Sequence, residues 1–381
     1  MQPAPTPDPN EARARLAGAR RIVVKIGSSL LIDGSGRARN GWLASLGDDI
    51  AALRSDGKQI VLVSSGAVAL GREHLGLKRS PRLDHKQAAA AAGQALLMQA
   101  WERALSPHGI PTAQLLLTFE DTEQRRRSLN ARATLEVLLG QGGLPVINEN
   151  DSVATEELRY GDNDRLSARV AQLVRADLLI LLSDVDGLYT ADPAGAPAAQ
   201  HVPFVARVTD ETMALASGSK AAGIGSGGMR TKLEAARIAS ASGCATIIGS
   251  GREERPLSRL AAGARATFVA ATGSPGKAYK QWIAGSLAPA GSVSIDDGAV
   301  AALAGGKSLL PGGIVSVEGR FDRGACIRIL DRDGVEIARG ITAYSAAEAR
   351  MIRGRGSIHI AEKLGYAGPD ELIHRDDLVM L

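Results

Sequence analysis

Six apolar runs between residues 21 and 250 constrain the fold of this chain more than any other feature. They are almost continuously apolar, and longer helix-like segments separate them: "RIVVKIGSSLL", "QIVLVSSGAVAL", "PTAQLLLTF", "LPVINENDSV", "ADLLILLSDVDGLY" and "ATIIGS". Strands without polar alternation are buried on both faces, as in a parallel sheet that helices cover. The sequence therefore predicts an α/β fold in which a mostly parallel sheet is sandwiched by helices.

The sequence pattern changes after about residue 276. Short stretches such as "GGIVSVEGRF" and "GACIRILDRDG" are punctuated by glycine, which is typical of a small β-rich domain. We expect residues 1–20 to form a variable tail whose proline-rich first ten residues are disordered. Residues 21–271 should form the first domain and residues 277–381 the smaller β-rich domain, with the linker within residues 271–282.

Composition excludes several classes of protein. Apolar residues make up 45% of the chain and charged residues 23%, as in ordinary globular proteins. No apolar run approaches the roughly 18 residues of a membrane span, and no signal peptide is evident, so we expect a cytoplasmic protein. The net charge of +4 is too small to imply a nucleic-acid partner.

The cysteines and histidines predict neither a disulfide nor a metal site. Cys244 and Cys326 are far apart in apolar contexts, which suits buried thiols in a reducing compartment. The six histidines lack the spacing of metal ligands.

A glycine-rich loop, "GIGSGGMRTK" at residues 223–232, precedes a helix-like stretch. Its glycines match the spacing of a dinucleotide-binding turn, but no apolar strand precedes them, as that turn requires. A Walker loop would need Lys and Ser or Thr where Met229 and Arg230 stand. With Thr231 and Lys232 in the first helical turn, the loop is predicted to bind an anion.

Lys25 is a single charge inside the first apolar run. A lysine in a buried strand is costly unless it is paired or meets an anion. For a lone lysine, an edge strand that exposes the amine to solvent is an equal alternative. The following Gly27, Ser28 and Ser29 favour a ligand, because they bring amides and hydroxyls to the end of the strand.

Polar residues also follow the second and fourth runs. Ser65 could cap a helix that starts at Ala67, or it could hold an acidic substrate together with the Gly66 amide. "INEND" at residues 147–151 and "GDND" at residues 161–164 are, singly, typical of turns. Together with the lysines and the glycine loop, they would form the kind of rim that phosphoryl transfer requires.

The lack of a catalytic-base motif restricts the class of molecule that could accept the phosphoryl group. No H-R-D or equivalent catalytic-base motif is present in the sequence, although a hydroxyl acceptor would usually need one. A carboxylate, with a pKa of about 4.3 for a glutamate side chain, is already ionised at neutral pH. The sequence therefore indicates a kinase whose acceptor is an acid.

These motifs resemble the glutamate 5-kinase family of the amino-acid kinase superfamily. The resemblance covers residues 21–381, and its motifs occur in the family's order: "VVKIGSS", "VSSGAVALGREHLG", "KQAAAAAGQ", "LLLT", "LNAR", "PVINENDSVAT", "GDNDRLSA", "LLSDVDGLYTADP" and "GSGGMRTK". The C-terminal part is similar to a PUA domain, a fold that also occurs in RNA-modifying proteins. The resemblance implies transfer of the ATP γ-phosphate to the side-chain carboxylate of L-glutamate, with Mg²⁺.

The resemblance also implies roles for individual residues. Lys25 and Lys232 would bridge the transferring phosphoryl group, and Asp164 would orient both lysines. Glutamate would be held by Ser65, Asp151 and Asn163. The nucleotide would be held by Lys25, Ser183, Asp184, Ser226, Gly227, Gly228, Met229, Arg230, Thr231 and Lys232. Ser183 and Ser226 stand where the family commonly has Thr, so each keeps a hydroxyl.

Three further expectations follow. Feedback inhibition by proline, at or overlapping the glutamate site, and a homo-oligomer are implied by the resemblance. Nucleic-acid binding is not expected, because residues 277–381 contain 13 basic and 13 acidic residues. The alternatives are a sibling kinase with another acceptor and an RNA-binding or RNA-modifying protein that uses the C-terminal domain.

Overall fold

The computed structural model describes the chain except residues 1–10, 81, 154–162, 194, 217–227 and 286–287. It divides into two compact units, Met1–Pro275 and Gly276–Leu381. Both cysteines are buried, and no disulfide joins them. Within the described residues, no helix is both long and apolar enough to cross a membrane.

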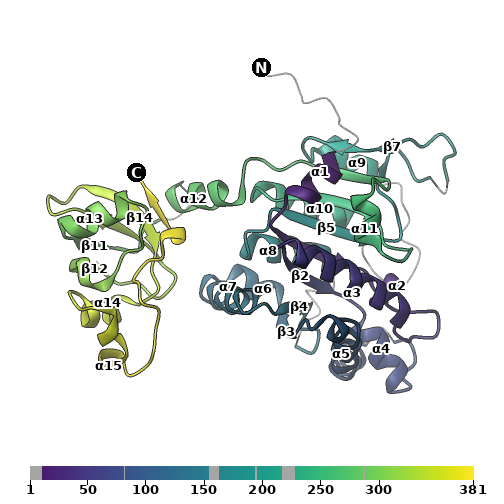
Figure 1. The fold of residues 1–381 in the computed structure, drawn as a ribbon, viewed down its shortest axis with the longest axis horizontal. Coiled ribbons are helices and arrows are strands. Elements are labelled where there is room, and N and C mark those ends of the chain that lie inside the picture. Colours follow the sequence, from purple (N-terminus) through teal and green to yellow (C-terminus); the bar gives the residue numbers. More distant parts are fainter. Residues whose placement is uncertain (1–10, 81, 154–162, 194, 217–227, 286–287) are drawn as a thin grey trace. The chain divides into compact units, whose positions relative to one another are not determined.

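An eight-stranded sheet forms the centre of the first unit, in the order β3-β4-β2-β1-β5-β9-β10-β8 (Figure 1). Its strands are β1 Arg21–Ile26, β2 Gln59–Ser64, β3 Thr112–Leu117, β4 Leu144–Glu149, β5 Leu178–Ser183, β8 Phe204–Val205, β9 Ala245–Ser250 and β10 Ala266–Val269. The six predicted runs supply β1 to β5 and β9, and these strands pair in parallel. β10 runs antiparallel to β9. The predicted mostly parallel sheet is thus confirmed.

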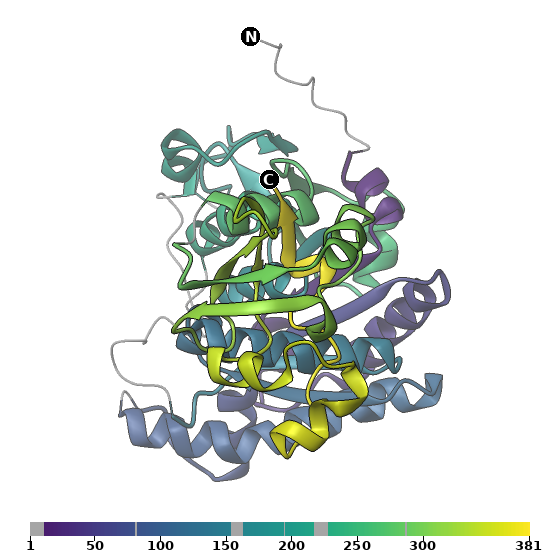
Figure 2. The same cartoon turned by 90° about the vertical axis from the view of Figure 1, so that its left-hand side faces the viewer.

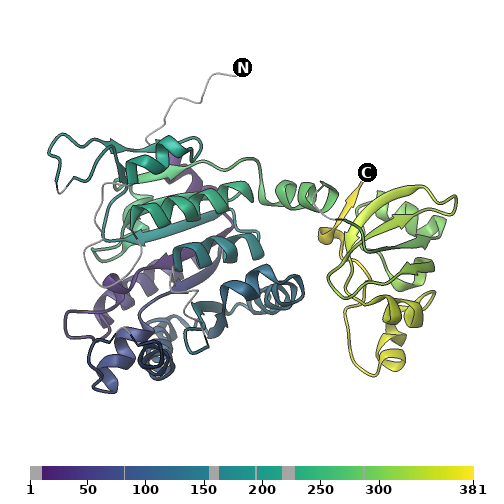
Figure 3. The same cartoon turned by 180° about the vertical axis from the view of Figure 1, so that it is seen from behind.

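Helices cover both faces of this sheet, as the opposite views in Figures 1 and 3 show. Side chains of α3, α5 and α11 join one apolar core, and those of α7, α8 and α10 join the other. The helices are α1 Glu11–Gly18, α2 Ser28–Leu31, α3 Asn40–Ser55, α4 Ala67–His74, α5 Leu83–Leu105, α6 Phe119–Glu123, α7 Arg125–Gly140, α8 Asn163–Leu173, α9 Asp210–Leu215, α10 Met229–Ala241 and α11 Pro256–Ala261. A two-stranded ribbon, β6 Leu188–Tyr189 and β7 His201–Val202, completes the unit.

The structure corrects the expected N-terminal tail. Residues 11–18 form helix α1, and Leu16 on this helix is only 2% exposed. This side chain joins the apolar core that α3 and α5 share. The sequence prediction gave too much weight to the proline-rich start, since packing against the core stabilises a short helix that its local sequence does not predict.

The second unit is built on a five-stranded sheet, in the order β12-β11-β13-β14-β15 (Figure 2). Its elements are α12 Pro275–Gly285, β11 Gly291–Ile295, α13 Asp297–Ala304, β12 Ile314–Gly319, β13 Cys326–Leu330, β14 Glu336–Ile341, α14 Ala346–Ile352, α15 Ile360–Leu364 and β15 Leu378–Met380. A separate apolar core lies within it. The predicted β-rich domain is therefore confirmed.

The expected linker within residues 271–282 is largely helical, because α12 begins at Pro275. Proline is well tolerated at the first position of a helix, where its missing N–H has no partner to lose. The helix is held to its own unit by two hydrogen bonds. Tyr279 donates its hydroxyl to Asp377 (2.8 Å), and Arg339 donates to the Ala284 carbonyl oxygen (2.9 Å).

Two glycines let helices α4 and α5 cross with their backbones in contact. A Cβ atom added to Gly71 would lie 1.8 Å from the carbonyl oxygen of Ala89, and one added to Gly93 would lie 1.8 Å from that of Ala67. No other residue type fits either position. The crossing fixes the start of α4 against the middle of α5, where Gln94 follows Gly93.

We expect Gly71→Ala to lower the free energy of unfolding by about 3 kcal/mol, because the added methyl group must push the two helices apart. Chemical denaturation of wild type and variant measures this change. Gly140→Ala, at the end of α7, is the matched control, since nothing lies within 4 Å of its added Cβ. An equal, small effect of both substitutions would contradict the close crossing.

Candidate active site

Polar residues from separate parts of the chain meet at the carboxyl edge of the parallel strands. Lys25 lies near the end of β1, Ser65 follows β2, and Asn163 and Asp164 begin α8. Lys232 lies in the first turn of α10. Ion pairs join both lysines to Asp164, and a hydrogen bond joins Ser65 to the adjacent Asn163, so the structure brings together the residues that the sequence assigned to a common rim.

At the centre of the network, one buried carboxylate pairs with two lysines. Asp164 is fully buried, and its Oδ1 lies 2.5 Å from the Lys25 ammonium while its Oδ2 lies 3.2 Å from the Lys232 ammonium. β1 pairs with β2 on one side and β5 on the other. The alternative of a solvent-facing lysine on an edge strand is therefore wrong for Lys25, which is 6% exposed.

The carboxylate at the centre of this cluster is ionised. Burial by itself raises the pKa of the Asp164 carboxyl, but the Lys25 and Lys232 ammonium groups outweigh burial and hold this pKa well below its usual range. The ion pairs hold the ends of both lysines beside one carboxylate at the sheet edge.

The start of α10 adds hydrogen-bond donors beside this cluster. Gly228 is the N-cap, and its lack of a side chain leaves the first-turn amides without side-chain capping. Thr231 places its hydroxyl 3.0 Å from Asp164 Oδ2 and 2.8 Å from the Gly228 carbonyl oxygen. The predicted helix start is confirmed. Ser226 and Gly227, which the sequence assigned to the nucleotide, lie outside the described residues.

The predicted capping role of Ser65 is wrong. The N-cap of α4 is Gly66, whose φ of 107° lies in the left-handed region that glycine favours. Ser65 instead accepts a hydrogen bond from the Asn163 side-chain amide at 2.7 Å. Its hydroxyl is therefore part of the polar network at the sheet edge.

A row of side-chain amides extends this network away from the lysines. Asn163 Nδ2 also donates to Asn148 Oδ1 (3.0 Å), and Asn148 Nδ2 donates to Gln94 Oε1 (2.9 Å). All three amide side chains are buried. The sequence reasoning gave no role to Gln94 or to Asn148 individually. Gln94 lies in the "KQAAAAAGQ" motif and Asn148 in the "INEND" motif, so each motif pointed to its residue. Only the fold shows that α5 lies next to β4.

Asp151 lies just beyond the end of β4, near this row. Burial raises the pKa of its carboxyl, and the Lys86 ammonium partly opposes this increase. The side chain keeps partial solvent contact. Asp151 therefore presents a carboxylate at the edge of the site.

Ser183 ends the neighbouring strand β5, and Asp184 follows it. The Ser183 hydroxyl donates to Asp184 Oδ1 at 3.0 Å, and the serine is 6% exposed. β5 pairs in parallel with β1, so its carboxyl end lies at the same edge of the sheet as Lys25.

Comparison with known proteins agrees with this geometry. Residues 20–250 match the model of the amino acid kinase family, and residues 291–364 match that of the PUA domain. The glutamate 5-kinase of Caulobacter vibrioides is 58% identical over 95% of this chain and 97% of its own. The chain belongs to the glutamate 5-kinase family.

Two further proteins are similar to this member of the glutamate 5-kinase family. Glutamate 5-kinase 1 of Rhizobium meliloti is 54% identical over 97% of this chain and 94% of its own. A solved UMP kinase from Bacillus anthracis aligns with a TM-score of 0.48 and 15% identity, over 67% of this chain and 98% of its own. The resemblance deduced from the sequence motifs is confirmed by the relatives.

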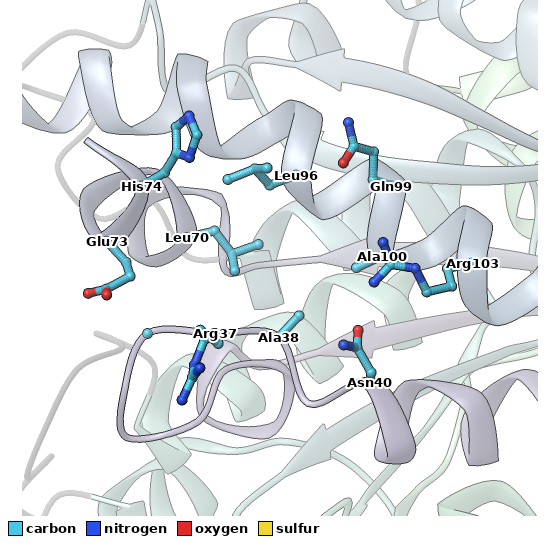
Figure 4. A pocket seen from close by; sticks show the side chains of 11 residues that line it. Arg37, Ala38, Asn40, Leu70, Glu73, His74, Leu96, Gln99, Ala100 and Arg103 are labelled. Atoms are coloured by element: carbon cyan, nitrogen blue, oxygen red, sulfur yellow. The ribbon is translucent and has the colours of Figure 1, made fainter. Parts of the chain in front are cut away.

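A separate cavity of about 260 Å³ lies between residues 36–40, α4 and α5 (Figure 4). Leu70, Leu96 and Ala100 give it apolar walls, and Arg103 lies at its side. None of the site residues predicted from the sequence lines this cavity. It therefore lies apart from the lysine cluster.

We expect Asp164→Asn to lower the free energy of unfolding by about 3 to 5 kcal/mol at neutral pH, because it removes the buried carboxylate that pairs with both ammonium groups. Chemical denaturation measures the difference from wild type. Asp56→Asn, at the exposed end of α3, is the control and should change stability by less than about 0.5 kcal/mol.

The pH dependence of this difference has a defined sign. The pKa of Asp164 is lower in the folded chain than its unfolded value of 3.8, so its stabilisation is fully present above 3.8 and is lost as pH falls through the folded value. The stability gap should stay constant between about pH 5 and 7 and narrow below about pH 4. A gap that widens on acidification would count against the ion-paired state.

Proposed function

We propose that this chain transfers the γ-phosphate of ATP to the side-chain carboxylate of L-glutamate, giving L-glutamyl 5-phosphate and ADP, the first step of proline biosynthesis. The observation that carries the proposal is the buried cluster in which two lysines share the Asp164 carboxylate. Two lysines held side by side suit a transferring phosphoryl group. The glutamate 5-kinases among its relatives support the same activity.

In this reaction the glutamate γ-carboxylate oxygen attacks the γ-phosphorus. A new C–O–P linkage forms, the bond from the γ-phosphorus to the bridging oxygen breaks, and ADP leaves with the electron pair. No general base is needed, because the nucleophile is already ionised at neutral pH. The two lysines stabilise the negative charge on the phosphoryl oxygens, and Asp164 holds both ammonium groups in place.

The nucleotide phosphates would lie at the start of α10, where Lys232, Thr231 and the first-turn amides offer donors. Met229 and Arg230 share that turn, and Ser183 and Asp184 would hold the rest of the nucleotide. Mg²⁺ would neutralise phosphate charge. Within the ranges that the structure describes, there is no cluster of three His, Cys, Asp or Glu that could hold a metal.

Glutamate would lie along the side of the site that contains the amide row. Asp151 offers a carboxylate for its ammonium group, while Ser65 and Asn163 offer a hydroxyl and an amide. The lysines would then face the γ-carboxylate. A sibling kinase with another acceptor is disfavoured by the identity to glutamate 5-kinases along nearly the whole chain.

Three further parts of this proposal concern the whole protein. We expect a homo-oligomer and a cytoplasmic location, and we assign the C-terminal unit a structural or regulatory role instead of nucleic-acid binding. Basic and acidic residues are equal in number from Lys277 onward. Its small arginine patch, Arg350, Arg353 and Arg355, would give only a weak and salt-sensitive contact.

We expect Lys25→Ala and Lys232→Ala each to reduce kcat with glutamate by about a hundredfold or more, because losing one preorganised charge at the phosphoryl group costs roughly 3 kcal/mol. Trapping the acyl phosphate with hydroxylamine measures the rate. Lys78→Ala removes an exposed lysine and should leave kcat unchanged. Near-normal turnover of either site variant would remove that lysine from the mechanism.

Proline is proposed as a feedback inhibitor that overlaps the glutamate site. It carries the same α-carboxylate and an ammonium-type nitrogen, but it has no γ-carboxylate to phosphorylate. If Asp151 binds the ammonium group of both molecules, Asp151→Asn should raise the glutamate KM and the proline inhibition constant in parallel, with the ATP KM nearly unchanged. Steady-state kinetics at several proline concentrations test this. Inhibition that no concentration of glutamate relieves would contradict the overlap.

A titration of the full chain with mixed tRNA at about 150 mM salt tests the assignment of the C-terminal unit. We expect no submicromolar binding, because the unit lacks a basic surplus. Tight binding that disappears when Arg350, Arg353 and Arg355 are replaced by alanine would overturn the assignment.

A further inference from the structure

The orientation of the buried amide row is fixed by a backbone group. The N–H of Glu149 donates to Asn148 Oδ1 at 2.9 Å, and a backbone N–H can only donate. Asn148 must therefore direct its Nδ2 toward Gln94, which accepts through Oε1. On the other side, Asn163 must donate through Nδ2 to the same Asn148 oxygen. All three side-chain amides thus have a defined direction.

With the amides in this orientation, one polar atom at each end of the row has no hydrogen-bond partner within the row. Gln94 Nε2 is a buried donor and Asn163 Oδ1 a buried acceptor, and neither has a hydrogen-bond partner in the described part of the chain. Their side chains belong to residues that are 9% and 8% exposed. A buried polar group without a partner is costly, and such groups are rare in folded proteins unless a ligand or water meets them.

The two ends lie at different distances from the phosphoryl centre along the network. Asn163 neighbours Asp164 in the first turn of α8, whereas Gln94 lies beyond Asn148, on the side of α5. An acceptor that places its γ-carboxylate at the lysines directs its opposite end toward the row. For glutamate, that opposite end carries the α-carboxylate and the ammonium group.

We propose that Gln94 is a specificity-determining residue whose Nε2 donates a hydrogen bond to the α-carboxylate of the acceptor amino acid. This inference rests on the proposed function. Asn163 Oδ1 accepts from the ammonium group of the same molecule, so the row matches the donor and acceptor pattern of an α-amino acid. A substrate without the α-carboxylate leaves the Gln94 donor unpaired, and an unpaired buried donor is a strong basis for discrimination.

Gln94→Glu tests this role with little change in shape. The new carboxylate still accepts from Asn148 Nδ2, so the row stays intact, but it has no N–H and repels the substrate carboxylate. We expect the glutamate KM to rise by about tenfold or more, with the ATP KM unchanged. A purely structural role for Gln94 would leave the glutamate KM unchanged.

4-Aminobutyrate serves as a probe, because it differs from glutamate only in lacking the α-carboxylate. Its inhibition constant against glutamate should change less than about twofold in Gln94→Glu, since it never used the donor. Gln99→Glu, the same substitution at an exposed position of α5, should change neither constant. Equal losses for glutamate and 4-aminobutyrate, or an unchanged glutamate KM, would overturn the proposal.

Two measurements separate the possible failures. ADP formation by the wild-type enzyme must depend on glutamate; if it does not, the proposed function fails, and the role of Gln94 fails with it. If wild type is active and Gln94→Glu melts at a much lower temperature, Gln94→Met removes the donor without adding charge. Gln94→Met should then weaken the binding of glutamate more than the binding of 4-aminobutyrate. An equal loss of affinity for both molecules would contradict the assignment.

Discussion

The ion-paired cluster around Asp164 is the interaction on which the rest of the site depends. It joins β1, α8 and α10 through a carboxylate that is fully buried between two ammonium groups. Removing one partner of a buried ion pair is costly, so the positions of the three elements are mutually determined. The cluster also holds two lysines together at the sheet edge.

The other half of the site is built mainly from neutral polar side chains. One hydrogen-bonded row contains Ser65, Asn163, Asn148 and Gln94. The close crossing of α4 and α5 holds Ser65 and Gln94, at the two ends of this row, in fixed positions relative to each other. The backbone N–H of Glu149 sets its polarity. In the function that we propose, the lysines serve the phosphoryl group, and the oriented amides serve a molecule that carries both charges of an amino acid.

Much of this arrangement could be predicted from local sequence. The apolar runs identified the parallel strands, and polar residues at their ends pointed to Lys25, Ser65 and Asp164, because parallel strands present their carboxyl ends at one edge. The capping role of Ser65 was wrong, because glycine at the next position allows a left-handed N-cap. Helix α1 was missed, since its stability comes from burial of Leu16 and not from local pattern.

The amide row could not be predicted, because its geometry depends on long-range packing. Gln94 and Asn148 are 54 residues apart, and only the glycine-mediated helix crossing brings them together. Nothing in the local sequence of either residue indicates which side-chain atom donates. That direction follows from the hydrogen bond between the Glu149 N–H and Asn148 Oδ1, combined with the contact between Asn148 and Gln94 that forms when helix α5 packs.

The central claim is that the lysine cluster transfers phosphate to a glutamate carboxylate. The most direct test measures ATP-dependent acyl phosphate formation, trapped as the hydroxamate, with glutamate, aspartate, N-acetylglutamate and carbamate as acceptors in parallel; ADP release is followed for each and for UMP. The account predicts hydroxamate and ADP in equal amounts with glutamate, and little of either with the other acceptors. Phosphorylation of another acceptor in preference to glutamate would contradict it.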